Sequence, residues 1–120
     1  MTRLYQFPAW QAGLVASGRK RQTIRRVSRP NAKPGDPLHL FSGRRRLVDP
    51  PPVCLAADRA TIALEPAGEV QGVVIAGRRL AAAGEASLAH DGGFQSVADM
   101  GRFYFGLVGP GDFEGVLIRW

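Results

Sequence analysis

Short alternating segments, most of them bounded by glycine or proline, recur along this chain of 120 residues. Within them apolar and polar side chains alternate, or β-branched residues dominate, as is typical of β-strands. A spacing of roughly 8–12 residues between such segments favours a small barrel. The predicted strands are QTIRRV (22–27), PLHLF (37–41), VCLAADRATIALE (53–65, one bent strand or a pair), VQGVVIAGRRL (70–80, with a turn at 77) and FEGVLIRW (113–120).

Two segments depart from this pattern and predict helices. Residues 8–18 place apolar side chains at helical spacing and end at Gly18, the position of a C-cap. Residues 96–109 begin with Ser96 as N-cap, with Asp99 three residues later in the place of a capping-box acid. We therefore expect an α+β, β-rich fold, a small barrel with two or more flanking helices. The residues predicted for the inner face of the second helix are Val97, Met100, Tyr104 and Leu107.

Nothing in the sequence divides the chain, so we expect one domain over residues 1–120. There is no internal repeat and no linker, and 45% of the residues are hydrophobic, enough for one modest core. The single cysteine, Cys54, excludes an internal disulfide and lies in an apolar run, where a small buried side chain is expected. The chain shows neither a secretory signal nor an apolar run long enough for a membrane span, so we expect a cytoplasmic protein without membrane partners.

Basic residues are concentrated in the first half of the chain. Residues 1–60 contain 12 Lys and Arg against 3 Asp and Glu, whereas residues 61–120 contain 4 against 7. Such an imbalance indicates an anionic partner, most simply RNA, another nucleic acid or a nucleotide. An arginine-rich, GC-rich coding sequence would produce the same composition without any such partner.

The run GRKRQTIRR (18–26) combines this charge with groups that can do chemistry. Thr23 and Arg25 share a face of an extended strand, and Lys20 reaches that face only if the Gly18–Arg19 turn bends the chain. A lysine desolvated near other cations can lose its proton at neutral pH and act as a base toward the threonine hydroxyl or a water. The simpler interpretation is a solvated strand with an exposed threonine.

Other candidates are less distinctive. Asp91 and Glu85 are the carboxylates nearest to the predicted start of the second helix, although aspartate also favours turns for local reasons. Two histidines and one cysteine without metal-ligand spacing predict no metal site, and no cofactor is indicated. Tyr5, Trp10 and Phe41 would stack on a base or pack in the core. The candidate phosphate contacts, which a solvated surface would explain equally well, are Arg19, Arg21, Arg26, Arg29, Arg44, Arg45 and Arg46.

Taken in order, several pieces of the chain resemble the ASCH domain family, over residues 7–120. The most specific element is the pattern Gly-x-Lys-x-x-Thr-x-Arg, which here comprises Gly18, Lys20, Thr23 and Arg25. The resemblance implies a PUA-like fold, a small β-barrel with flanking helices. The other matching pieces are KPGDPLHLFSGRR (33–45), Cys54, DGGFQSVADMGRFYF (91–105) and FEGVLIRW (113–120).

The resemblance implies several functions for the family. Some small members hydrolyse the amide of N4-acetylcytidine and related acylated cytidines without a metal, others are ribonucleases, and the PUA likeness suggests RNA-binding modules without catalysis. In the amidohydrolases the motif lysine and threonine act with a carboxylate from the segment before the second helix. Carried over, these are Lys20 as base, Thr23 as nucleophile or water-orienting group, and Asp91 or else Glu85, with Arg25 orienting an anion or the carboxylate.

Overall fold

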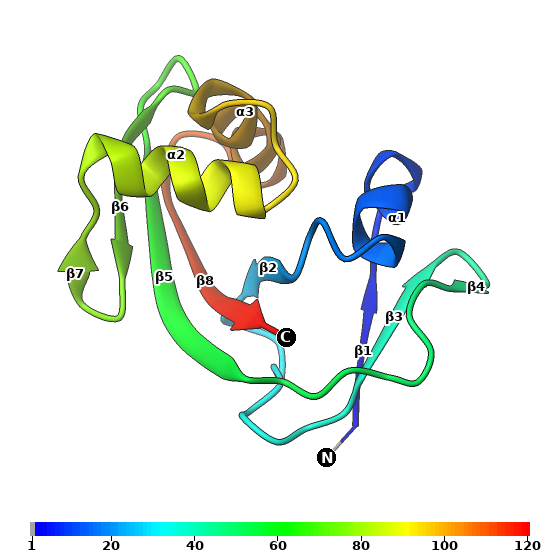
Figure 1. The fold of residues 1–120 in the computed structure, drawn as a ribbon. Helices are drawn as coiled ribbons and strands as arrows, with labels where there is room; N and C mark the ends of the chain where they lie inside the picture. The colour runs from blue at the N-terminus through cyan, green and yellow to red at the C-terminus, as the bar shows by residue number, and fades with distance from the viewer. Residues whose placement is uncertain (1) are drawn as a thin grey trace.

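Residues 2–120, which the computed structural model describes, form two sheets that lie side by side, each with helices packed near it (Figure 1). The strands are β1 (Arg3–Gln6), β2 (Gln22–Arg26), β3 (Leu38–Ser42), β4 (Arg45–Arg46), β5 (Ala56–Leu64), β6 (Val70–Ile75), β7 (Arg78–Arg79) and β8 (Gly111–Arg119). The helices are α1 (Ala9–Ala16), α2 (Ala82–Asp91) and α3 (Val97–Val108). The expectation of a β-rich α+β fold is confirmed.

The larger sheet has five antiparallel strands in the order β2-β8-β5-β6-β7. Strands β5 and β8 of this sheet pair along nine positions, from Ala56 opposite Arg119 to Leu64 opposite Gly111. One face packs against α2 and α3 and forms the first hydrophobic cluster, in which Ile62 and Phe113 are almost fully buried. This cluster supplies most of the apolar burial that stabilises the C-terminal half.

The smaller sheet has the order β1-β3-β4, with β1 parallel to β3. Together with α1 it encloses a second hydrophobic cluster, built around Leu38, Leu40 and Val15. Ile118 of β8 belongs to this second cluster, whereas its neighbour Leu117 belongs to the first. Because side chains alternate along a strand, β8 contributes to both clusters and joins the two parts of the molecule.

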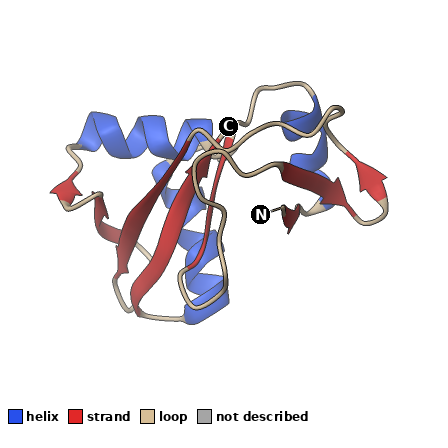
Figure 2. Ribbon diagram, turned by 90° about the horizontal axis from the view of Figure 1, so that it is seen from below, coloured by secondary structure: helices blue, strands red, loops and turns tan. Residues whose placement is uncertain are grey.

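The strands of residues 2–120 do not close into a barrel. β2 has β8 as its only sheet neighbour, and the three-stranded sheet pairs with no strand of the larger one. The view from below shows the two sheets as separate units with loops crossing between them (Figure 2). Two of the edge strands, β4 and β7, are only two residues long, which limits the exposed hydrogen-bonding edge.

Helix α3 follows its predicted bounds closely. The side chain of Ser96 accepts a hydrogen bond from the Asp99 amide at 3.1 Å, as an N-cap does. Its buried face contains Met100, Gly101 and Tyr104. The prediction that Leu107 lies on the inner face is wrong: its side chain is 47% exposed and lines a cavity beside β2.

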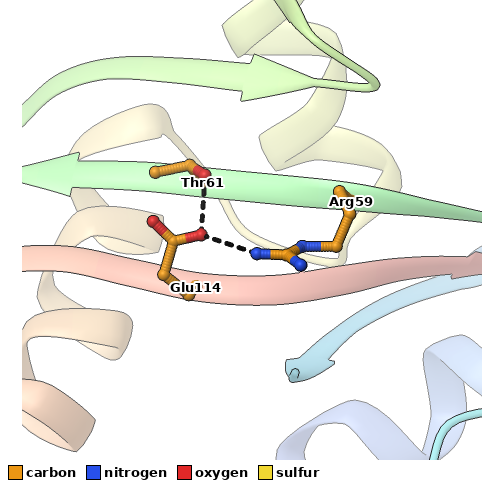
Figure 3. A network of polar contacts seen from close by, with 3 residues as sticks. All are labelled: Arg59, Thr61 and Glu114. Carbon is orange, nitrogen blue, oxygen red and sulfur yellow. Dashed lines mark hydrogen bonds and ion pairs between the residues drawn. The ribbon is translucent and has the colours of Figure 1, made fainter. Parts of the chain in front are cut away.

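Charged side chains lie on the face of the larger sheet opposite Ile62 and Phe113. There the carboxylate of Glu114 accepts hydrogen bonds from the Thr61 hydroxyl at 3.0 Å and from Arg59 at 3.3 Å (Figure 3). Both partners of the ion pair are substantially exposed, so the pair contributes little stability. Among residues 2–120, no helix is both long and apolar enough to cross a membrane.

Candidate functional site

The turn after α1 determines where Lys20 points. Gly18 has a φ of +80°, in the region that favours glycine, and the amide of Lys20 donates back to the Leu14 carbonyl at 2.9 Å. The chain thus reverses within a few residues and turns the Lys20 side chain inward, where only 3% of the residue is exposed. A regular strand from Gly18 onward would have pointed Lys20 away from Thr23.

The Lys20 ammonium lies in a buried and largely aromatic environment. Its Nζ donates to the main-chain oxygen of Gly92 at 2.5 Å and lies 5.7 Å from the ring centroid of Phe7 and 6.0 Å from that of Phe94. Burial, and secondarily the positive charge of Arg25, lowers the pKa of Lys20 from 10.5 to about 7. At neutral pH a large fraction of this amine is therefore unprotonated and able to accept a proton.

Thr23 and Arg25 share a face of β2 and interact directly. The Nε of Arg25 donates to the Thr23 hydroxyl oxygen at 3.0 Å, and its Nη2 donates to the Gln6 carbonyl at 2.7 Å. The guanidinium carbon lies 5.2 Å from the ring centroid of Tyr5 and 4.8 Å from that of Phe7. These contacts hold the guanidinium in one orientation, and they leave the Thr23 hydroxyl proton free to be donated elsewhere.

Lys20, Thr23 and Arg25 line one cavity of about 610 Å³, a size that suits a small ligand. Its walls come from β1, α1, β2, α3 and the turn after β2, so the cavity lies where the two parts of the molecule meet. Aromatic rings make up much of the wall. The aromatic side chains lining the cavity are Tyr5, Phe94, Phe103, Tyr104 and Phe113.

Gln11 also lines this cavity, and our sequence analysis missed it. The residue is 4% exposed and its side-chain amide forms no hydrogen bond within residues 2–120, but the amide is not fully buried, because among those residues only Arg3 Nε is a fully buried side-chain polar atom without a partner. A carboxamide that lines a cavity without a protein partner is free to bind a ligand or a water there. The sequence did contain a signal, because Gln11 precedes the buried Val15 by one helical turn and so places a polar group on the inner face of α1.

Neither predicted carboxylate reaches the cavity. Asp91 is the last residue of α2 and is exposed, and Glu85 lies in the first turn of the same helix. Neither of them lines the cavity, and among the described residues no other Asp or Glu does so. The main-chain oxygen of Gly92 contacts the Lys20 ammonium instead. Gly93 follows with a φ of +87°, and a Cβ there would lie 3.3 Å from the Lys20 side chain.

The arginines expected to contact phosphate lie in different places. Arg26 lines the cavity and donates to the Leu107 carbonyl at 3.1 Å. Arg19 lies in a neighbouring groove, where it donates to the carbonyl of His90 at 2.6 Å and to its Nδ1 at 3.0 Å. Arg21 is exposed beside Gly18, and Arg29 lines the cavity within the turn after β2. The remaining three, Arg44, Arg45 and Arg46, are exposed around the β3–β4 turn and line neither cavity.

The neighbouring groove has a volume of about 680 Å³ and shares Phe94 and Phe103 with the first cavity. Trp10, 53% exposed, packs against both rings at centroid distances of 5.9 and 6.3 Å. The part of the chain that the structure describes contains no cluster of three or more His, Cys, Asp or Glu residues suited to a metal. Comparisons with protein-family models, with curated proteins and with solved structures give no significant match to this chain.

Proposed function

We propose that this chain is an ASCH-type, PUA-like protein whose cavity binds an N4-acylated cytidine and hydrolyses its amide. The observation that carries the proposal is a lysine with a pKa of about 7 in the same cavity as a hydrogen-bonded threonine–arginine pair. A base whose pKa lies near the working pH is well suited to general base catalysis. The aromatic wall suits a planar base.

In this proposal the neutral amine of Lys20 takes a proton from the Thr23 hydroxyl or from a water that the hydroxyl positions. The oxygen attacks the acyl carbon, while the Arg25 guanidinium holds the Thr23 side chain in place through the hydrogen bond from its Nε. Lys20 then returns the proton to the exocyclic nitrogen as the carbon–nitrogen bond breaks. With water as the nucleophile the products are cytidine and a carboxylic acid; with Thr23 as the nucleophile, a water hydrolyses the acyl-threonine in a second step.

Gln11 has a role in the same proposal. A carboxamide offers one acceptor and two donors, so it can pair with the hydrogen-bonding edge of a nucleobase. Its partnerless amide in the cavity wall supports recognition of a base there. The pyrimidine would lie between the aromatic rings, with its acylated nitrogen toward Lys20.

The test is to incubate the purified protein with N4-acetylcytidine and follow the release of cytidine by chromatography. Wild type should release cytidine, and Lys20→Met, which keeps the length of the side chain without its amine, should reduce the rate by at least about a hundredfold. Lys33→Met is the matched control, because Lys33 is the only other lysine and is exposed. Equal rates for wild type and Lys20→Met would refute the proposal.

A second candidate function is RNA binding without catalysis. The observation that favours it is the absence of any carboxylate among the described residues that line the cavity, together with the exposed Arg44 and Arg45. It predicts an RNA affinity that falls steeply with salt and that weakens more on charge reversal at these two positions than on Thr23→Ala. Affinity that is flat across salt concentrations would count against it.

A further inference from the structure

The cavity lined by Lys20, Thr23 and Arg25, called the central cavity from here on, has more basic than acidic side chains in its wall. Its lining includes four basic residues and, among the residues that the structure describes, no Asp or Glu. The side-chain ion pairs of residues 2–120, Arg59–Glu114 and Arg102–Asp99, involve none of the residues that line it. The two tyrosines of the lining stay neutral, because burial raises the pKa of both. The four basic residues are Lys20, Arg25, Arg26 and Arg29.

Arg25 is the cation for which this imbalance matters most. It is half-buried between the cavity and the rings of Tyr5 and Phe7, and it remains protonated because a guanidinium does not lose its proton in proteins. Two of its nitrogens donate to Thr23 and Gln6, whereas Nη1 has no protein partner among the described residues. Partial burial weakens the solvation of this cation and no carboxylate of the cavity lining compensates it, so an anion on the ligand would be favoured here.

The turn after β2 extends this charge to the mouth of the cavity. Arg29 and Asn31 line the cavity within that turn, and the amide of Asn31 donates to the carbonyls of Arg26 and Arg29 at 2.9 and 3.1 Å. Arg29 is exposed, and its side chain forms no hydrogen bond or ion pair within residues 2–120, so it can turn toward an incoming ligand. Arginines presented in this way suit the planar, two-point recognition of a phosphate.

We propose that the ligand of this cavity carries a phosphate, which binds against Arg25 and Arg29, so that the substrate is a cytidine nucleotide unit and not the free nucleoside. The identity of the base rests on the proposed function, but the requirement for an anion does not. The phosphate belongs either to a free nucleotide or to an RNA chain, which offer the same chemistry at this site.

The experiment measures equilibrium binding of cytidine, cytidine 5′-monophosphate and a short oligocytidylate by calorimetry. None of the three carries an acyl group, so turnover does not interfere. At low salt the monophosphate should bind at least about tenfold more tightly than cytidine, and the ratio should fall as salt is raised. Arg29→Gln should lower that ratio by about threefold or more. Arg78→Gln, which removes an exposed arginine from the far edge of the larger sheet, should leave it unchanged.

The outcomes separate this inference from the proposed function. Equal affinities for cytidine and its monophosphate would overturn the requirement for an anion, even if N4-acetylcytidine is hydrolysed. A clear preference for the monophosphate that Arg29→Gln reduces would support it, even if no hydrolysis is found. If the oligocytidylate binds more tightly still, the phosphate comes from RNA; if it binds no better than the monophosphate, the ligand is the free nucleotide. Both of these results support the inference.

Discussion

The side-chain nitrogen of Lys20 donates a hydrogen bond to the main-chain oxygen of Gly92, a residue 72 positions further along the chain, at 2.5 Å. This contact joins the turn after α1 to the residue that follows α2, two segments far apart in the sequence. A carbonyl oxygen accepts a hydrogen bond from an ammonium without carrying a full negative charge. It therefore anchors the amine while doing less than a carboxylate would to keep it protonated.

The rate of amide hydrolysis should depend on pH through Lys20. Its pKa of about 7 means that the amine is protonated below neutrality and cannot then accept a proton. The logarithm of kcat/KM should fall by about one per pH unit well below pH 7 and level off above it. A pH–rate profile between about pH 5.5 and about pH 8.5 is the measurement. A profile that is flat across this range would show that Lys20 is not the base.

Thr23 should tolerate serine but not valine. Thr23→Ser keeps a hydroxyl next to the Nε of Arg25, whereas Thr23→Val keeps the shape and removes the acceptor. Loss of a partner for a buried charged donor costs about 1.5–3 kcal/mol of unfolding free energy, and the proposed reaction loses its nucleophile or water-orienting group. Urea unfolding and cytidine release measure the two effects. Full activity in Thr23→Val would contradict the proposed role.

Gln11→Glu should move the pH dependence of the reaction upward. A Cβ placed on Gly93 would lie 3.3 Å from the Cδ of Lys20 and 3.8 Å from the Nε2 of Gln11, so the two side chains flank the same point. A carboxylate at position 11 favours the protonated form of Lys20 and raises its pKa. The midpoint of the pH–rate profile should rise by about one unit or more. Gln11→Met is the uncharged control, and an unchanged midpoint in Gln11→Glu would disprove the proximity.

Two glycines of α3 should respond to alanine in opposite directions. A Cβ on Gly101 would lie 2.9 Å from the Gly68 carbonyl oxygen and 2.9 Å from a methyl of Val70, so Gly101→Ala should lower the unfolding free energy by about 1–3 kcal/mol. Gly106 has open space at the same position, so Gly106→Ala should raise it by about 1 kcal/mol. Urea unfolding of both variants is the measurement. Equal stability would mean that α3 does not approach the β5–β6 turn this closely.

Removing the charge of Asp91 should change hydrolysis only slightly. The side chain is exposed at the end of α2 and does not line the cavity, so Asp91→Asn should keep the rate within about threefold of wild type. Glu85→Gln should likewise keep the rate within about threefold of wild type, because Glu85 does not line the cavity either. Cytidine release under saturating substrate is the measurement. A loss of a hundredfold or more in either variant would mean that the carboxylate reaches the substrate during the reaction.

Elements with a local signal were predicted well from the sequence. The helix after Ser96 has a cap and an apolar face, and the strands around Leu38 and Ile62 alternate or carry β-branched residues. Helix α2 was missed because its ten residues bury only Leu88 and Ala89 and its start has no side-chain cap. The arrangement of the strands into two sheets depends on pairings between segments far apart in sequence, such as β1 with β3, which no local pattern predicts.

For the candidate site, the motif around Gly18 suggested how Lys20 could turn toward Thr23, and the structure places both in one cavity. The oxygen that contacts Lys20 could not be predicted, because it depends on how the end of α2 packs and belongs to the backbone. The same packing leaves Asp91 in solvent. Gln11 had a readable signal, a polar residue on the buried face of a short helix, which our sequence analysis did not use.

The cavity lies between two hydrophobic clusters that share β8. A ligand held there by residues of β1, β2 and α3 therefore couples two regions that would otherwise open more independently. Ligand binding raises the free energy of unfolding of the whole chain, by about 2.7 kcal/mol when the ligand concentration is a hundred times the Kd. The melting temperature thus reports occupancy of the cavity, and a library of nucleotides can be screened by thermal shift without assuming any reaction.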